Sequence, residues 1–223
     1  MNKDDLKIEA LLDLSKTCAA KIFEGLTYPW EALPKISEFI MSLGPTLDKD
    51  EFEQRGDNIW IAKSAKVAPT AFLSGPLIIF PDAEIRHCAF IRGSAIVGRG
   101  CVIGNSTELK NCIIFEGAQV PHYNYIGDSI LGYKAHLGAG AITSNLKSDR
   151  SIVTIPDDDG RINTELKKFG AIVGDNVEVG CNSVLNPGTV IGRGSTVYPL
   201  SMVRGTVPAN SIYKKQGEIA EKI

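Results

Sequence analysis

Aliphatic residues recur at every sixth position through most of this chain. The first run of these positions is unbroken and comprises Ile61, Val67, Leu73, Ile79, Ile85, Ile91, Val97, Ile103 and Leu109. A second run comprises Val173, Val179, Leu185, Ile191, Val197 and Val203. Neither the period of an amphipathic helix nor the alternation of an isolated strand gives this spacing. A fixed six-residue repeat predicts a parallel β-helix, in which three hexapeptides form one triangular coil of about 18 residues.

Small residues follow most of these positions four places later. They include Ala65, Ala71, Ala83, Ala89 and Ala95 in the first run and Ser183, Thr189, Ser195 and Ser201 in the second. A short side chain suits the corner at which the chain turns from one face of a coil to the next. We therefore expect a mainly β fold, a parallel β-helix of about seven coils.

The residues before the repeat have a helical pattern. Apolar positions over 4–24 predict an amphipathic helix, and a second helix is expected from Pro29 to the Gly44-Pro45 pair. Residues 1–57 are accordingly expected to form an N-terminal helical segment that packs on the β-helix or on a neighbouring subunit.

The repeat also stops once inside the β-helix, which is expected to span residues 58–212. The interruption at 146–170 predicts an inserted hairpin arm, with a strand over 151–155 and a turn over 156–160. Three aspartates in that turn are expected to be solvated rather than to bind a metal. Residues 213–223 are expected to form a C-terminal tail.

Composition limits the classes of partner that the protein is expected to bind. The chain has 24 Lys and Arg against 26 Asp and Glu, a formal net charge of -2, so nucleic acid is not an expected partner. No stretch approaches the roughly 20 apolar residues of a membrane span, and the N-terminus lacks the basic start and apolar run of a secretory signal. The five cysteines have no clustered spacing. We therefore expect a protein of the reducing cytoplasm.

Candidate chemistry gathers in the middle coils. His122 lies in VPHYNYIGDSILG, and LGAGAITSN follows a short distance later. Histidine titrates near neutrality and is suited to take a proton from an amine. A backbone N–H at a glycine-rich turn is suited to stabilise the charge that develops on a thioester oxygen. Together these features predict acyl transfer to an amine.

The run from Ala89 to Asn145, which contains both motifs, resembles the left-handed β-helix hexapeptide acyltransferases. It is similar to the acetyltransferase half of the bifunctional bacterial enzyme that makes UDP-N-acetylglucosamine. PHYNYIGDSILG and LGAGAITSNL are also similar to archaeal sugar-1-phosphate nucleotidylyltransferases whose C-terminal β-helix acetylates amino-sugar phosphates. The resemblance implies left-handed coils, acetyl-CoA as co-substrate, and glucosamine-1-phosphate or galactosamine-1-phosphate as acceptor. It also implies a homotrimer with sites between neighbouring β-helices.

The resemblance assigns roles residue by residue. His122 matches the general base, and the N–H of Ala139 matches the donor to the developing oxyanion. The residues matched to the acceptor site are Arg92, Glu108, Lys110, Tyr125 and Asn145, of which Arg92 and Lys110 match cations that hold the phosphate. The residues matched to the acetyl-CoA groove are Cys181, Tyr198, Pro199, Lys214 and Lys215.

Two positions depart from the family pattern. His136 stands where the family usually has a sugar-binding asparagine, and Leu146 stands where the bacterial enzyme has a tyrosine. His136 is still expected at the acceptor site, where it would alter recognition of the sugar and make galactosamine-1-phosphate a candidate beside glucosamine-1-phosphate.

One further expectation and two alternative functions limit this interpretation. No glycine-rich nucleotide loop occurs, so we expect a chain without the nucleotidyltransferase domain of the bifunctional relatives. A γ-class carbonic anhydrase would need three converging zinc-binding histidines, and the spacing of the three histidines does not fit, so no metal is expected. A non-catalytic β-helix, acting as a scaffold or regulatory subunit related to sugar nucleotidyltransferases, stays open.

Overall fold

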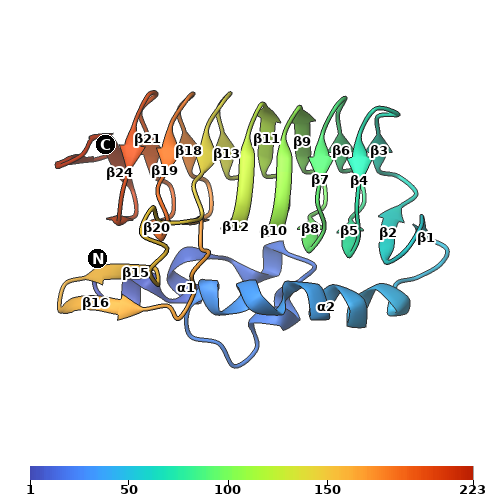
Figure 1. Cartoon of the computed structure of the whole chain (residues 1–223), viewed down its shortest axis with the longest axis horizontal. Coiled ribbons are helices and arrows are strands. Elements are labelled where there is room, and N and C mark those ends of the chain that lie inside the picture. Colours follow the sequence, from blue (N-terminus) through green and yellow to red (C-terminus); the bar gives the residue numbers. More distant parts are fainter. Residues whose placement is uncertain (223) are drawn as a thin grey trace.

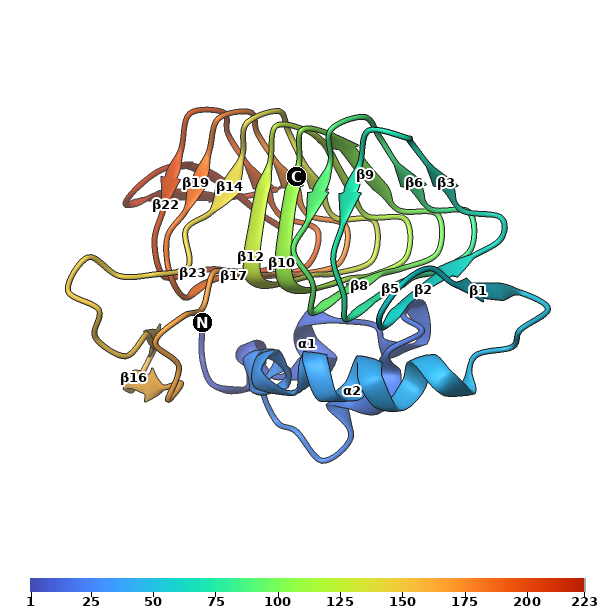
Figure 2. The ribbon, with the colours of Figure 1, turned by 45° about the vertical axis from the view of Figure 1, so that its right-hand side comes forward.

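The six-residue repeat folds into three stacks of short parallel strands, one stack for each face of a left-handed triangular solenoid (Figures 1 and 2). The computed structural model describes residues 1–222. The repeat positions point inward, and Ile79, Ile91, Val97 and Ile103 are completely buried in one continuous core. The prediction of a mainly β, left-handed parallel β-helix is confirmed.

One stack, the covered face, packs against the helical segment. Its strands are β2 (Ile59–Ala62), β5 (Leu77–Ile79), β8 (Ala95–Val97), the second half of β10 (Glu108–Ile114), the second half of β12 (Tyr125–Leu131), β17 (Ala171–Val173), β20 (Thr189–Ile191) and β23 (Thr206–Val207).

A second stack, the open face, has no such cover. Its strands are β4 (Phe72–Leu73), β7 (Phe90–Ile91), the first halves of β10 and β12, β14 (Ile142–Thr143), β19 (Val184–Leu185) and β22 (Met202–Val203).

The third stack, the polar face, is exposed and largely hydrophilic. Its strands are β3 (Lys66–Val67), β6 (Glu84–Ile85), β9 (Val102–Asn105), β11 (Gln119–His122), β13 (His136–Leu137), β18 (Glu178–Val179), β21 (Thr196–Val197) and β24 (Ser211–Lys215). Two faces thus stack eight strands each, so the solenoid is slightly longer than the expected seven coils.

Both ends of the solenoid are closed by antiparallel strands. β1 (Phe52–Gln54) pairs with β2 at one end, and β25 (Glu218–Glu221) pairs with β24 at the other. Of the segment expected as a tail over 213–223, residues 213–222 instead complete the last coil and fold back on it, and Ile223 lies outside the described residues. Such pairing covers sheet edges that would otherwise expose unpaired backbone groups.

The single helix expected over 4–24 is absent. The segment forms four short pieces, η1 (Asp4–Leu6), α1 (Ile8–Leu11), η2 (Leu14–Lys16) and η3 (Ala20–Phe23). Its apolar side chains are buried as expected, but the backbone is extended at Lys7 and Leu12. The segment follows the surface of the covered face, and tertiary packing outweighs the local helical pattern.

The second helical stretch is continuous but mixed. It comprises the 3-10 helix η4 (Pro29–Lys35), the α-helix α2 (Ile36–Leu43) and the short η5 (Gly44–Thr46). Pro34 lies inside η4, and proline cannot donate the backbone bond that an α-helix needs there. No helix within residues 1–222 combines the length and apolar character needed to cross a bilayer.

The arm is a two-stranded hairpin of β15 (Thr154–Asp157) and β16 (Gly160–Asn163). Its strands begin later, and its turn is tighter, than the pattern predicted. The reason lies at the base of the arm, where Val153 and Ile155 are completely buried beside Phe169. Phe169 also packs against Trp30, with ring centroids 5.9 Å apart, so the arm and the helical segment share one apolar cluster.

Candidate active site

His122, Ala139 and Cys181 lie on successive coils along one edge of the solenoid. This edge, the base edge, is where the polar face turns into the open face. The N–H of Gly140 donates to the His122 carbonyl at 3.0 Å, and the N–H of Asn182 donates to the Ala139 carbonyl at 2.8 Å. Neighbouring coils are separated by about 4.8 Å. The structure therefore brings the predicted base and the predicted oxyanion donor together.

The glycines around Ala139 leave its N–H available. A Cβ on Gly138 would meet the backbone of Cys181, and one on Gly140 would clash with Asn182. Gly140 also has a φ of +71°, which favours glycine. Within residues 1–222, the Ala139 N–H donates to no acceptor. A free N–H in a half-exposed turn is the feature that oxyanion stabilisation requires.

Asn124 fixes the geometry of this edge, and the sequence analysis did not identify it. Its side chain is 3% exposed. Its Oδ1 accepts from the His122 N–H at 3.1 Å, and its Nδ2 donates to the carbonyls of Gly138 and Ala141 at 2.8 and 2.9 Å. One buried amide thus ties the His122 segment to the turn that carries Ala139. The His122 ring is exposed and has no hydrogen bond within residues 1–222.

The opposite edge of the open face, the cation edge, holds a second polar cluster around Asp128. Asp128 is 4% exposed. Its carboxylate accepts from Asn111 Nδ2 at 2.9 Å and from Asn145 Nδ2, and it lies 3.3 Å from Lys110 Nζ. Asp128 was not among the residues predicted from the sequence. A carboxylate among the aliphatic residues of YIGDSIL was the available signal, since a buried carboxylate needs partners.

Arg92 lies on the same edge. Its guanidinium makes an ion pair of 2.7 Å with Glu108, and Glu108 raises the pKa of Arg92 through this hydrogen bond and its charge. Lys110 faces the Asp128 carboxylate, with its Nζ 3.3 Å away. The two predicted phosphate-binding cations are therefore both present on this edge, but each already faces a carboxylate and the four charges cancel.

Tyr125 lies on the open face between the two edges. Its hydroxyl oxygen accepts from Asn145 Nδ2 at 3.2 Å. Burial raises the pKa of Tyr125, and the charges of Asp128 and Glu108 add to this effect, so the phenol is neutral at physiological pH. Gly127 allows the ring to lie flat, because a Cβ there would clash with the phenol.

His136 does not join this group. It lies on the polar face, in register with Gln119 and Glu178, and its Nδ1 is 2.7 Å from Glu178 Oε2. Within one chain the structure does not bring His136 together with Tyr125, and its place at the acceptor site stays a prediction. The corner containing Ala139 separates it from Tyr125's face.

The residues expected at the acetyl-CoA groove continue the base edge. The N–H of Leu200 donates to the Cys181 carbonyl at 2.9 Å, which places Pro199 on the coil after Cys181. Tyr198 and Cys181 are both exposed.

Lys214 and Lys215 follow on β24, in the last coil. Tyr213 of this strand pairs with Val197. The two lysines follow Tyr213, so they lie beside Tyr198 and Pro199 of the neighbouring coil. Their ammonium groups are 3.8 and 3.2 Å from Glu218.

The remaining histidine, His87, also lies on the base edge but is bound to Thr70 Oγ1 at 2.8 Å. Within residues 1–222, no three or more His, Cys, Asp and Glu side chains gather in a way that would hold a metal ion.

Comparisons with known proteins add to this geometry. Residues 73–167 match the family model of the GMPPB C-terminal domain, and residues 170–205 match the bacterial transferase hexapeptide model of six repeats. The chain is 31% identical over 222 residues to the bifunctional protein GlmU of Methanococcus vannielii, covering 96% of this chain and 53% of that protein.

A second relative is the bifunctional sugar-1-phosphate nucleotidylyltransferase/acetyltransferase of Sulfurisphaera tokodaii. It is 30% identical over 177 residues, which cover 71% of this chain and 44% of that protein. The chain spans about half the length of the curated relatives it matches. Among solved structures, the acetyltransferase domain of PglB from Neisseria gonorrhoeae with acetyl coenzyme A is similar, with 13% identity and a TM-score of 0.32 over 70% of this chain and 53% of that one. The sequence matches confirm the predicted resemblance.

Proposed function

We propose that this hexapeptide-repeat chain, similar to bifunctional GlmU proteins over most of its length, is an acetyl-CoA-dependent N-acetyltransferase. Its proposed acceptor is an amino-sugar 1-phosphate, either glucosamine-1-phosphate or galactosamine-1-phosphate. The name of the Sulfurisphaera tokodaii relative, which combines sugar-1-phosphate nucleotidylyltransferase and acetyltransferase, supports the acetyl transfer. The five free cysteines support a reducing cytoplasm as its location.

One observation carries the proposal: a candidate base and a cation cluster lie on opposite edges of the same open face. His122 and Ala139 are on the base edge, Lys110 and Asn145 are on the cation edge, and Tyr125 lies between them. Three residues of extended strand separate the edges by about 10 Å. An acceptor that places its phosphate at the cation edge and its amine at the base edge would lie across Tyr125.

The proposed reaction is a direct transfer. His122 takes a proton from the sugar amine, and the nitrogen attacks the thioester carbon, so that a C–N bond forms and the C–S bond breaks. The Ala139 N–H stabilises the negative charge that develops on the carbonyl oxygen. The CoA thiolate leaves, and His122 returns the proton to it.

The base edge also supports acetyl-CoA as the donor. Cys181, Tyr198 and Pro199 give this edge an exposed surface beyond Ala139, and Lys214 and Lys215 supply cations for the cofactor's phosphates. Cys181 lies two coils from His122, about 10 Å away. This separation argues against a Cys–His nucleophile pair, and hence against an acyl-enzyme.

The phosphate site requires an exchange of partners. A phosphate arriving at Arg92 meets a guanidinium that already binds Glu108, so we infer that it shares or replaces that carboxylate. Asp128 has a different proposed role, because it is buried. It orients Lys110 and Asn145 toward the open face rather than contacting the acceptor.

A homotrimer is part of the proposal. The open face exposes large apolar side chains, among them Phe72, Phe90 and Met202, and a neighbouring copy would cover them. Phe72 and Phe90 also pack together, with ring centroids 5.5 Å apart, and an exposed apolar patch is typical of an interaction site.

The test is release of free thiol from acetyl-CoA in the presence of glucosamine-1-phosphate, galactosamine-1-phosphate, a UDP-amino sugar and the free amino sugars. We expect turnover with a 1-phosphate, and the faster of the two identifies the sugar. Absence of turnover with every acceptor, together with absence of acetyl-CoA binding, would contradict the proposal and favour a scaffold.

A further inference from the structure

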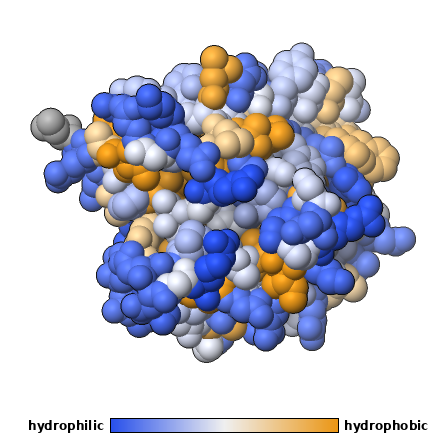
Figure 3. Space-filling model, turned by 60° about the vertical axis from the view of Figure 1, so that its left-hand side comes forward, coloured by the Kyte–Doolittle hydropathy of each residue, from blue (hydrophilic) through white to orange (hydrophobic). Residues whose placement is uncertain are grey.

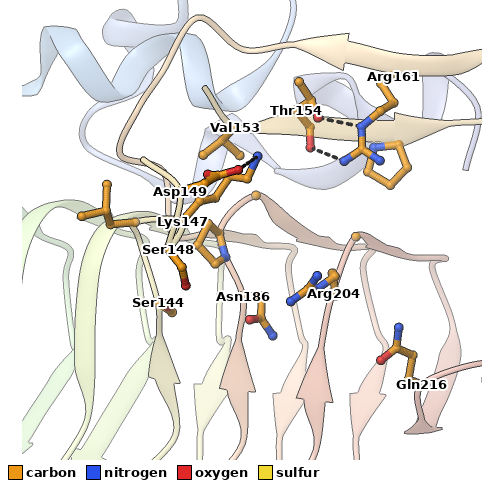
Figure 4. Close-up of a pocket in the computed structure, with 15 residues that line it drawn as sticks. Ser144, Lys147, Ser148, Asp149, Val153, Thr154, Arg161, Asn186, Arg204 and Gln216 are labelled. Atoms are coloured by element: carbon orange, nitrogen blue, oxygen red, sulfur yellow. Dashed lines mark hydrogen bonds and ion pairs between the residues drawn. The ribbon is translucent and has the colours of Figure 1, made fainter. Parts of the chain in front are cut away.

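A pocket of about 540 Å³ lies between the arm and the ends of three coils (Figure 4). Ser144 and Leu146, which flank the acceptor-site residue Asn145, are among its lining residues. We call it the arm pocket. Figure 3, which brings this end of the molecule forward, shows a predominantly hydrophilic surface. The volume is within the range of small-molecule sites, about 300–1,000 Å³.

The lining of the arm pocket is positively charged. It contains three cationic side chains, those of Lys147, Arg161 and Arg204, and one carboxylate, that of Asp149, which lies 4.0 Å from Lys147 Nζ. Asp149 is already engaged, because it accepts from the N–H and hydroxyl of Ser151 at 2.9 and 2.8 Å.

In the described part of the chain, neither arginine has a carboxylate partner. There, Arg161 donates only to the hydroxyl and carbonyl of Thr154, at 2.6 and 3.3 Å. Arg204 is exposed and makes no hydrogen bond or ion pair with any of residues 1–222. Figure 4 shows it next to Asn186 on the coil edges below the arm. At the cation edge, by contrast, Arg92 and Lys110 each face a carboxylate. The uncompensated positive charge near the acceptor site is therefore in the arm pocket.

The wall of the pocket is preformed. The N–H of Gly188 donates to the carbonyls of Phe169 and Gly170 at 3.1 and 2.9 Å, which joins the base of the arm to a coil corner. Gly188 and Gly205 have φ of +80° and +83°, and a Cβ on them would meet Val153 and Pro156. Since Val153 is completely buried, the arm is fixed in place. A fixed wall lowers the entropic cost of binding.

We propose that the arm pocket is a second anion site, which binds the phosphate or diphosphate of a small phosphorylated molecule. Guanidinium groups match phosphate oxygens in a bidentate fork, and Ser144, Ser148 and Asn186 supply neutral hydrogen-bonding groups. Arg204 lies two coils beyond Ser144, about 10 Å along the axis. The ligand is either an acceptor that extends beyond Asn145, such as a nucleotide sugar, or a separate phosphorylated effector.

The first experiment measures binding alone, by calorimetric titration of inorganic pyrophosphate and of UDP into the whole chain. Arg204→Gln and Arg161→Gln are each expected to weaken binding about 10-fold or more, as for a lost charged hydrogen bond. Arg86→Gln is the matched control, since Arg86 is paired with Glu84 at 3.0 Å beside the polar face. Lys110→Gln is expected to keep the affinity.

Two results would overturn the inference. One is equal affinity in the wild type and both pocket variants, or no binding to any of them. The other is loss of binding in Lys110→Gln but not in Arg204→Gln, which would place the anion at the acceptor site. Because no turnover is needed, this experiment decides the inference even if the proposed acetyl transfer fails.

A second experiment distinguishes the sources of the phosphate and rests on the proposed function. If Arg204→Gln raises KM about 10-fold for a UDP-amino sugar and leaves KM for the 1-phosphate unchanged, the pocket holds the extended acceptor. If both KM values are unchanged but pyrophosphate alters the wild-type rate and not the variant's, the ligand is an effector. An active enzyme with neither response would contradict the proposal.

Discussion

The covered and open faces share one repeat and one core, yet their outward-facing side chains differ in kind. The outward residues of the covered face are Trp60, Ile78, Ile96, Ile113, Ile130, Ile172 and Val190, all buried beneath the helical segment or the arm. Those of the open face are Phe72, Phe90, Glu108, Tyr125, Ile142, Val184 and Met202, all partly or largely exposed. The repeat therefore determines the inside of the solenoid. The residues at the outward positions differ between the faces, so that one face contributes to stability and the other to function.

The open face acquires its chemistry where the coils are shortened. Asn111, Asp128 and Asn145 are each 17 positions apart, whereas His87 and Asn105 on the regular coils are 18 apart. β10 and β12 run through the corner between the two faces. Asn111 and Asp128 turn it with φ of +48° and +47°. This tight corner brings the Asp128 carboxylate between Lys110 and Asn145.

The largest expected effect is on catalysis at the base edge. His122→Ala is expected to lower kcat/KM by about 10²–10⁴-fold, because the sugar amine loses its general base, while the melting temperature stays close to wild type. His87→Ala is the matched control, since His87 also lies on the base edge but is hydrogen-bonded to Thr70, and it is expected to change kcat/KM by no more than about twofold. Steady-state kinetics with the best acceptor checks both. An unchanged rate in His122→Ala would remove it as the base.

The covered face is expected to respond in stability instead. Ile113→Ala should lower the free energy of unfolding by about 2–5 kcal/mol, since it opens a cavity under α2. Phe72→Ala on the open face, where the side chain is 62% exposed, should cost at most about 0.5 kcal/mol. Urea denaturation measures the free energy of unfolding of both variants, at protein concentrations low enough for the chain to be a monomer. Equal losses would contradict the division between the faces.

Asp128 links the two faces, so its substitution should affect both properties. Asp128→Asn is expected to lower kcat/KM by about 10–100-fold, because Lys110 and Asn145 lose their common partner and shift. It should also lower the free energy of unfolding by about 1–3 kcal/mol. Asp149→Asn, an exposed carboxylate of the arm, is the control for stability. An active Asp128→Asn variant of normal stability would refute the positioning role.

The smallest effect concerns the Tyr125 hydroxyl. Tyr125→Phe is expected to lower kcat/KM by about 2–10-fold, the value of one hydrogen bond. The raised pKa of Tyr125 also predicts how stability depends on pH. The folded state favours the neutral phenol, so this contribution to stability is present below pH about 10, the unfolded value, and is lost as pH rises through the folded pKa. Alkaline denaturation should therefore begin at higher pH in Tyr125→Phe. An identical onset of alkaline denaturation in the wild type and in Tyr125→Phe would contradict this effect of the tyrosine pKa.

The family resemblance named His122 and Ala139, and the structure brings them to the same corner on adjacent coils. The six-residue period alone does not give this pairing, because the two residues are 17 positions apart. Asn124 was not predicted, since its role depends on which groups meet across the coils rather than on spacing along the chain. Asp128 did leave a signal, a carboxylate among aliphatic residues, but the sequence does not give the partners that it binds. The resemblance also did not predict that a corner separates His136 from Tyr125, because motif matching gives no information on the face from which a side chain projects.

The helical segment shows the opposite limit. Leu6 and Leu11 are buried as the apolar pattern indicated, but burial against a solenoid face does not require one continuous helix. The extended backbone at Lys7 and Leu12 is set by the surface that the segment covers.

The most direct test of the account is a crystal structure of the protein with CoA and an amino-sugar 1-phosphate. We expect density for the phosphate at Arg92 and Lys110, the sugar over Tyr125 with its nitrogen toward His122, and the CoA sulfur beside Ala139. Density for the sugar on the polar face beside His136 of its own chain, with the open face empty, would contradict the assignment of function to the open face.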